Sequence, residues 1–295
     1  MMKRIFVAIM VTVGFSYTAV AQSNLLNAKT PEMVGVKTAE QVEADNDQPL
    51  EYGYVDDRDI LWSKTVWEVI DLDERINFPL YYPIDTVNIG ADRRSLYQIF
   101  MRELNAGRLE VYADSYFTEK RTTADIESAL VAKDTLDAGF DQLNAGETLS
   151  AEYVDIREIS GADIEAFHIK GVWYFDKRQG EMKYRLLGIA PVAPDVQTIN
   201  DDEPDMIELF WVWFPTIRPA LHDAKVFNKN NTAMPLSYDH LLNSRRFNAT
   251  IIKEDNEYGD RQVNEYVREN ALMQLLEAER IKERIRDFEQ DMWSY

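Results

Sequence analysis

The chain has 295 residues, contains no cysteine and carries 32 Lys and Arg against 52 Asp and Glu, a formal net charge of −20. This length suffices for one large domain or two small ones, and the missing cysteines exclude disulfides and thiol catalysis. A strongly negative surface repels phosphate backbones and anionic headgroups, so we expect no nucleic-acid partner and no direct binding to a lipid surface.

Residues 1–21 have the pattern of a secretory signal peptide. Basic residues precede an apolar run from Ile5 to Phe15, and Ala19-Val20-Ala21 offers a small-x-small cleavage site. The run is shorter than the roughly 20 residues that a membrane-spanning helix needs. Gln22 would follow the cut, so the chain is not predicted to be a lipoprotein. We expect a soluble, exported mature chain with a net charge of −22, because cleavage removes two basic residues.

Residues 22–57 are polar and acidic, with little apolar periodicity. This composition predicts an arm or linker without a core of its own. Two interpretations stay open: a disordered leader, or an arm that becomes ordered on a neighbouring subunit with Tyr52 and Tyr54 as anchors. Residues 58–295 are predicted to form a single domain.

The first predicted helix covers Asp59 to Asn77 and ends before Pro79. Its apolar residues recur at helical spacing: Trp62, Val66, Val69 and Ile70. A second helix is predicted to begin at Asp92 and to end at Gly107. Four apolar residues share one of its faces: Leu96, Ile99, Phe100 and Leu104.

A strand over 108–117 and a weaker helix from Ala124 to Leu136 are predicted next, followed by a loop over 137–152. Val172 to Phe175 is predicted to be a strand, and Asp176 to Gly180 a turn in which glycine takes positive φ. Alternating residues after the turn predict a half-buried antiparallel strand that ends at Ala190-Pro191.

Residues 208–219 are predicted to form a strand with large apolar residues on both faces, which indicates a central strand or a face left for a partner. A helix over 236–244 and a strand over 247–253 follow. The last element is predicted to be a long helix of about 261–293, roughly 45 Å in length, which either packs along the sheet or extends to another subunit. Its apolar stripe comprises Leu272, Leu275 or Leu276, Ile281, Ile285, Phe288 and Met292. The predicted class is α+β, a small antiparallel sheet packed with several helices.

Catalytic and metal-binding patterns are weak in this sequence. His168, His222 and His240 lack the spacing of a metal site, and neither a GxSxG motif nor a phosphate-binding glycine loop occurs. The acidic residues at 201–205 lack the ligand spacing of a calcium loop. We predict no catalytic residues, cofactor or metal site. Two other hypotheses remain open, a periplasmic glycan hydrolase with paired carboxylates and a ligand-binding module.

Aromatic residues stand out, with 6 Trp, 15 Tyr and 13 Phe gathered in a few segments. Such residues fill cores and also anchor protein interfaces. The candidates for a partner interface are Trp62, Trp67, Tyr81, Tyr82, Trp211 and Trp213.

Together with the signal peptide, several segments resemble the GldN/PorN family of the gliding-motility and type IX secretion machinery of Bacteroidetes. The resemblance runs with gaps from about residue 58 to the C-terminus and depends on the order of its segments, none of which is a catalytic fingerprint. These segments are LWSKTVWEVIDLDERINFPLYYP (61–83), DRRSLYQIFMRELNAGRLEVY (92–112), IKGVWYFDKRQGEMKYRLLGIAPV (169–192), LFWVWFPTIRPAL (209–221) and RIKERIRDFEQDMW (280–293). The resemblance does not include the loop at 194–205.

The resemblance implies a non-enzymatic structural subunit in the periplasm. Members of this family pair with an outer-membrane lipoprotein, GldK/PorK, and form a large ring on the periplasmic face of the outer membrane. The trans-envelope motor proteins GldL and GldM are linked to that ring. The partners implied for this chain are therefore the lipoprotein, the motor proteins and neighbouring copies in the ring, and the hairpin at 172–192 is implied to be scaffold near an interface.

Overall fold

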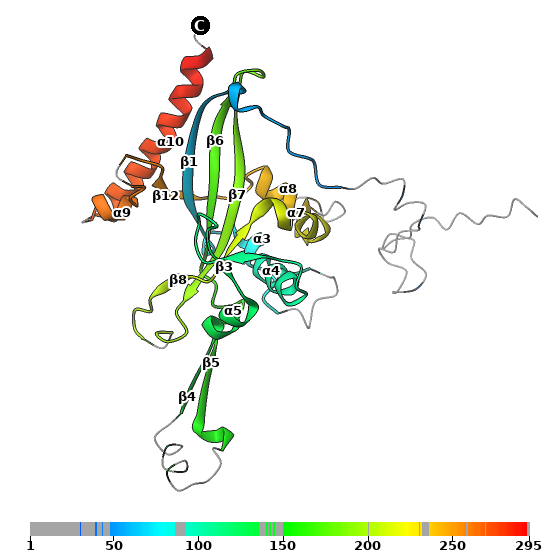
Figure 1. Ribbon diagram of the computed structural model, residues 1–295, viewed down its shortest axis with the longest axis vertical. Helices are drawn as coiled ribbons and strands as arrows, with labels where there is room; N and C mark the ends of the chain where they lie inside the picture. Colours follow the sequence, from blue (N-terminus) through cyan, green and yellow to red (C-terminus); the bar gives the residue numbers. More distant parts are fainter. Residues whose placement is uncertain are drawn as a thin grey trace, which may run out of the picture. The chain divides into compact units, whose positions relative to one another are not determined.

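The computed structural model describes residues 48–85, 93–135, 150–199, 201–229, 236–257, 259–268 and 270–293, with isolated positions at 30, 39, 43, 140, 142, 144 and 231. Contacts divide the chain into two units, Met1–Gln48 and Pro49–Tyr295. The fold below is that of the second unit (Figure 1). The predicted signal peptide lies outside the described residues, as does most of the predicted arm before residue 48.

An antiparallel sheet of eight strands forms the centre of this unit, in the order β12-β1-β6-β7-β9-β2-β3, with β8 paired to β7. Its three long strands lie side by side in Figure 1: β1 (Ile60–Asp71), β6 (Ala166–Asp176) and β7 (Glu181–Pro194). Five short strands complete it: β2 (Val111–Tyr112), β3 (Lys120–Arg121), β8 (Met206–Glu208), β9 (Trp211–Trp213) and β12 (Thr250–Glu254). The predicted α+β class with an antiparallel sheet is confirmed.

The segment predicted to be the first helix is strand β1, so that prediction was wrong. β1 pairs with β6 from Ile60↔Asp176 to Asp71↔Ala166, and with β12 on its other side. Val66, Trp67 and Ile70 are all buried. A central strand covered on both faces carries a near-continuous apolar run, and helical spacing fits such a run equally well. The β-branched and aromatic content of the segment favours the strand.

The predicted hairpin is confirmed as β6, a turn and β7. Gly180 has φ +68° at the end of the turn, where a side chain would be strained. The prediction that the second strand ends at Ala190-Pro191 was wrong, since β7 continues to Pro194. Pro191 fits within the strand because only its carbonyl is needed there, and this oxygen accepts from the Leu209 amide at 3.0 Å.

The helices among the described residues of the second unit are α3 (Phe78–Tyr81), α4 (Leu96–Asn105), α5 (Thr123–Leu130), α7 (Phe214–Asp223), α8 (Tyr238–Asn243), α9 (Val263–Tyr266) and α10 (Ala271–Trp293). The second predicted helix is confirmed as α4, and its four-residue apolar face is buried. Ser95, not Asp92, caps it, because its hydroxyl accepts from the Gln98 amide in a capping box. Gly107 follows the helix with φ +67°.

Three segments predicted to be single elements are divided in the structure. The weaker third helix is α5 followed by β4 (Val131–Thr135), which pairs with β5 (Val154–Glu158) in a separate ribbon. The strand predicted at 208–219 is β9 followed by α7, whose first turn contains a proline. The last helix starts at Ala271, after the short helix α9, ten residues later than predicted. Short elements complete the fold: η2 (Asp57–Asp59), η3 (Ala151–Tyr153), β10 (Lys225–Val226) and β11 (Leu236–Ser237).

Three buried apolar clusters are found among the described residues, and two of them hold helices on the sheet. The larger one joins the sheet to α3, α4, α5, α7 and α8, with Phe100, Phe167, Phe210 and Tyr238 at its centre. The smaller one lies beneath α10, where Ala278, Ile281 and Ile285 pack on Val66 and Ile251. Figure 1 shows α10 beside β12 and β1, away from α7 and α8. The last helix therefore packs along the sheet for part of its length.

Candidate functional site

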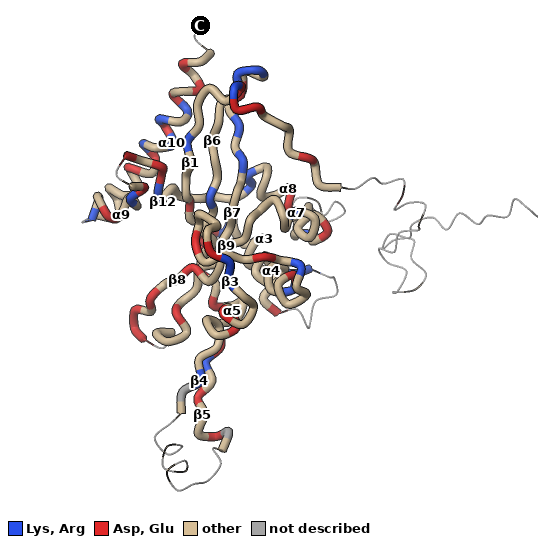
Figure 2. Tube along the Cα trace, in the orientation of Figure 1, with Lys and Arg blue, Asp and Glu red and all other residues tan. Residues whose placement is uncertain are grey.

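The described residues contain no group of three or more His, Asp or Glu side chains placed to hold a metal ion. Among these residues, no helix combines the length and the apolar character needed to cross a bilayer. Acidic residues gather along the segment that carries β8, whereas α10 alternates both signs of charge (Figure 2).

A row of three side chains crosses the sheet at Trp67. This residue lies opposite Lys253 of β12 and opposite Lys170 of β6, so all three project from one face of the sheet. The Nζ atoms of Lys253 and Lys170 lie 4.4 Å and 4.8 Å from the Trp67 ring centre. Each ammonium group thus faces the negative face of an aromatic ring.

The loop between β2 and β3 lies over this row. Its Ser115 carbonyl accepts from Lys170 Nζ at 2.9 Å, and its Tyr116 hydroxyl accepts from Lys253 Nζ at 3.0 Å. The same hydroxyl donates to Asp260 Oδ2 at 2.8 Å. Burial lowers the pKa of Lys170, and the nearby Lys253 lowers it further. We name five side chains the aromatic-lysine layer. Three belong to the row on the sheet, Trp67, Lys170 and Lys253, and two belong to the loop over it, Tyr116 and Phe117.

Glu208 extends this region toward β8. It accepts from Trp211 Nε1 at 2.6 Å, and its other oxygen lies 2.7 Å from His168 Nδ1. Burial raises the pKa of Glu208, but the hydrogen bonds from His168 and Trp211 outweigh it, and the net shift is downward. The arrangement ties β6 to β8 and β9 and holds the carboxylate ionised.

Two of the predicted interface residues are internal. Trp67 is 4% exposed and Trp211 0%, and both belong to a buried cluster with Ala190. Trp213 lies at the edge of this cluster, with its ring 4.8 Å from that of Phe117.

The other three predicted residues keep some exposed surface. Trp62 stacks on Phe288 of α10 at a centroid distance of 4.7 Å. The Tyr81 hydroxyl donates to the Ala162 carbonyl at 2.8 Å. The ring of Tyr82, which is half exposed, packs edge-on against the Tyr81 ring, with the two ring centres 4.8 Å apart. The structure thus places the six candidates in three separate regions, not in one patch.

Tyr52, one of the predicted anchors of the arm, contacts its own chain. Its hydroxyl donates to Asn243 Oδ1 at 2.8 Å, and the Arg218 guanidinium lies 4.2 Å from its ring centre. Burial raises its pKa to about 12. Tyr54 is exposed. The beginning of the second unit is therefore fixed to α7 and α8 through Tyr52.

A family model for the gliding motility associated protein GldN matches residues 55–294. The chain belongs to the GldN family. The match begins just before β1 and ends with α10, so it spans nearly the whole second unit. No curated protein matches the chain. Membership confirms the resemblance drawn from the sequence and makes the chain a component of the gliding-motility machinery.

One surface of this GldN-family chain was missed by sequence reasoning. The start of α10 carries four large apolar side chains that are 47 to 62% exposed: Leu272, Met273, Leu275 and Leu276. The predicted stripe joined leucines of this turn to Ile281 and Ile285 on one face, but the buried positions of α10 are Ala278, Ile281 and Ile285. Four apolar residues among five consecutive positions surround a helix rather than line one face, and this signal could have revealed the surface. We name these four residues the α10 apolar turn.

Proposed function

We propose that the protein is a non-enzymatic structural subunit of a ring on the periplasmic face of the outer membrane, within the type IX secretion and gliding machinery. The observation that carries this proposal is the GldN family match over residues 55–294. The predicted signal peptide and the Gln22 that follows its cleavage site support a periplasmic subunit without a lipid anchor of its own.

The partners proposed are a GldK/PorK-like outer-membrane lipoprotein, GldL/GldM-like motor proteins and further copies of the chain. A ring subunit needs at least two surfaces for its neighbours, and repetition makes weak contacts strong. The α10 apolar turn supports one such surface, because exposed apolar side chains that lie together favour protein contacts. It is continuous with a hollow of about 340 Å³ lined by Leu275, Val263 and Ile252.

Four of the aromatic candidates stay in the proposal as interface residues, since they retain exposed surface: Trp62, Tyr81, Tyr82 and Trp213. Trp67 and Trp211 are assigned to internal packing, because a partner could reach them only by opening the aromatic-lysine layer.

The glycan-hydrolase hypothesis has little support from the carboxyl groups. A glycosidase needs one carboxylic acid whose pKa is raised so that it can donate a proton. The described carboxyl groups with a shifted pKa are all shifted downward: Asp56, Glu103, Asp114, Asp125, Glu208 and Asp260. We therefore assign none of these six carboxyl groups the role of a proton donor.

The test is an affinity purification from native envelopes, with a C-terminal tag and gentle detergent. We expect a very large complex that contains one lipoprotein in near-equal amount. The double variant Leu272→Lys/Leu276→Lys should reduce recovery of the complex. Asp287→Lys on the same helix, which changes the net charge equally at an exposed position, should not. A lone monomer after mild cross-linking of the wild-type protein would overturn the proposal.

A further inference from the structure

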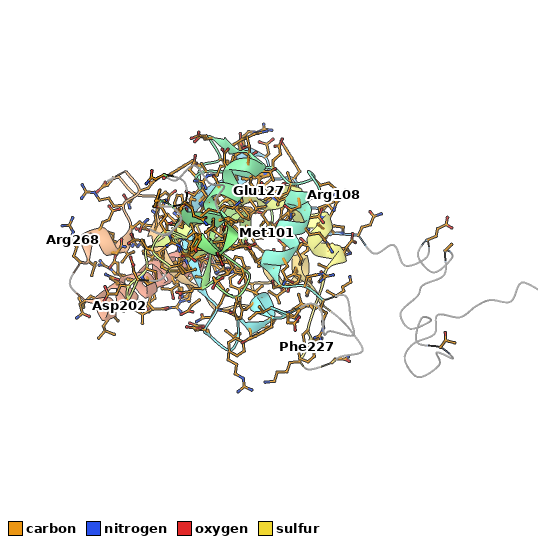
Figure 3. The ribbon with its side chains drawn as sticks, turned by 90° about the horizontal axis from the view of Figure 1, so that it is seen from below. Met101, Arg108, Glu127, Asp202, Phe227 and Arg268 are labelled. Carbon is orange, nitrogen blue, oxygen red and sulfur yellow. The ribbon has the colours of Figure 1, made fainter. Side chains whose placement is uncertain are left out.

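An open hollow of about 640 Å³ lies beside α3, between residues 78–85, Arg93 and residues 227–229. Three aromatic side chains at this hollow are 37 to 51% exposed: Phe78, Tyr82 and Phe227. Phe227 lies at the outer edge of the molecule in Figure 3, apart from the acidic loop that carries Asp202. We name the hollow beside α3 the aromatic-basic hollow.

The charge of the hollow is opposite to that of the chain. Arg75, Arg93 and Lys229 line it, against one acidic residue, Asp85, while the whole chain carries −20. Arg75 and Lys229 are exposed, and neither forms an ion pair with another residue in the described part of the chain. The Arg93 guanidinium lies over the Phe227 ring, 5.2 Å from its centre, within the range of a cation–π contact.

The walls of the hollow are fixed to the core. The buried Tyr238 hydroxyl of α8 lies 3.0 Å from the Pro79 carbonyl of α3 and 2.7 Å from the Arg94 carbonyl beside Arg93, within hydrogen-bond reach of both. Leu80 is buried below the exposed rings. The Phe78 and Tyr82 rings pack edge to face at 5.6 Å. A site whose backbone is held in this way loses little entropy on binding.

We propose that the aromatic-basic hollow binds an extended segment of a partner protein in which carboxylates flank a bulky apolar side chain. The aromatic walls exclude water from an apolar side chain, and a hollow of this size accommodates one or two of them. Arginine guanidinium groups bind carboxylates through paired hydrogen bonds, and lysine adds a third cation. The acidic remainder of the chain repels such a segment, so its binding is directed to this place.

Binding at the aromatic-basic hollow does not depend on whether the chain forms a ring. Purified mature protein, without the machinery, therefore suffices to measure it.

The test begins with selection of random eight-residue peptides, displayed on phage, against the mature protein. Enriched peptides are then synthesised with a fluorescent label, and their affinity is measured by anisotropy. We expect enriched sequences to carry Asp or Glu beside Phe, Leu or Trp. We expect their affinity to fall about tenfold or more in Arg75→Glu and in Tyr82→Ser, a loss typical of interface anchors. Arg286→Glu, an exposed arginine of α10, is the matched control and should leave the affinity unchanged.

Three results would overturn the proposal. The first is the absence of any enriched peptide. The second is enrichment of the wrong peptides, either basic ones or ones whose affinity for both hollow variants equals that for the wild type. The third is binding of vesicles with anionic lipid that depends on Arg75 while peptides fail, which would assign the hollow to a membrane surface. Thermal unfolding midpoints confirm that the variants are folded, and both substituted side chains lie at exposed positions.

Discussion

Trp62 of β1 stacks on Phe288 of α10, with ring centres 4.7 Å apart and planes inclined by 18°. Phe288 also meets Phe175 of β6 edge-on at 6.3 Å. The C-terminal half of the last helix is thus fixed to the long strands, while its first turns expose leucines. One helix serves two purposes, internal packing at one end and a proposed contact surface at the other.

The first prediction concerns this stacked pair. Trp62→Ala and Phe288→Ala should each lower the free energy of unfolding, because each removes an aromatic ring from the contact between sheet and helix. The double variant should lose less than the sum of the two, with a coupling of about 0.5–1.5 kcal/mol. Urea denaturation followed by circular dichroism measures all four proteins. Full additivity would mean that the two rings do not stabilise each other.

The second prediction separates core from interface. Trp211 has no exposed surface, so Trp211→Ala should lower the free energy of unfolding by about 3–5 kcal/mol. Trp213 is only partly buried, and Trp213→Ala should cost less. Denaturant titration of both variants provides the measurement. If Trp211→Ala had the same free energy of unfolding as the wild type but failed to assemble, Trp211 would have to contact a partner. The aromatic-lysine layer would then have to open so that the partner could reach this side chain.

The third prediction is a pH dependence that arises from Glu208. Its pKa is below the ordinary value of 4.5 in the folded chain, so the folded state binds the proton less readily than the unfolded state. Its contribution to stability is therefore complete above pH 4.5 and is lost as the pH falls through the lower folded value. Glu208→Gln should remove that contribution. The difference in free energy of unfolding between wild type and variant should therefore shrink as the pH falls from 6 to 3, a range of about 1.5 units on each side of the ordinary pKa.

Thermal unfolding midpoints at several pH values check this expectation. Asp201→Asn, which removes an exposed carboxylate of the acidic loop, is the control for the loss of one negative charge. A constant gap between wild type and Glu208→Gln across the range would contradict the assigned ionisation.

Several elements could be predicted from the sequence because their signals are local. The hairpin at 172–192 alternates around a glycine turn, and α4 has an apolar face with polar residues on the other side. β1 could not be predicted in this way, because its partners β6 and β12 lie more than 90 residues away along the chain. Its burial on both faces removes the alternation that identifies a strand. The switch from β9 to α7 within one apolar run was hidden for the same reason.

The candidate surfaces were harder to predict from the sequence than the helices and strands. Trp62, Tyr82 and Trp211 look alike in the sequence as aromatic residues in apolar runs, yet the structure makes one a helix contact, one exposed and one internal. The aromatic-basic hollow joins segments about 140 residues apart, Phe78–Asp85 and Phe227–Lys229, and no local pattern marks it. Family resemblance, in contrast, was accessible because it depends on the order of segments along the chain.

The last prediction concerns Gly188 of β7, which lies beneath the loop between β2 and β3. A Cβ atom at this position would lie 2.5 Å from the ring of Phe117 and 3.2 Å from that of Trp211. The Phe117 ring also packs against the rings of Tyr112 and Trp213, at centroid distances of 5.4 Å and 4.8 Å, so it has little room to move aside. Gly188→Ala should therefore overpack the layer and lower the free energy of unfolding by about 1–3 kcal/mol.

The same substitution should shift the fluorescence of Trp211 and Trp213, because the ring of Phe117 packs against both. Gly53→Ala is the matched control, since nothing lies within 4 Å of the Cβ that it adds. It should be neutral or slightly stabilising, as it restricts the unfolded chain without a clash. A fully stable Gly188→Ala with unchanged fluorescence would mean that the loop does not lie over β7 in solution.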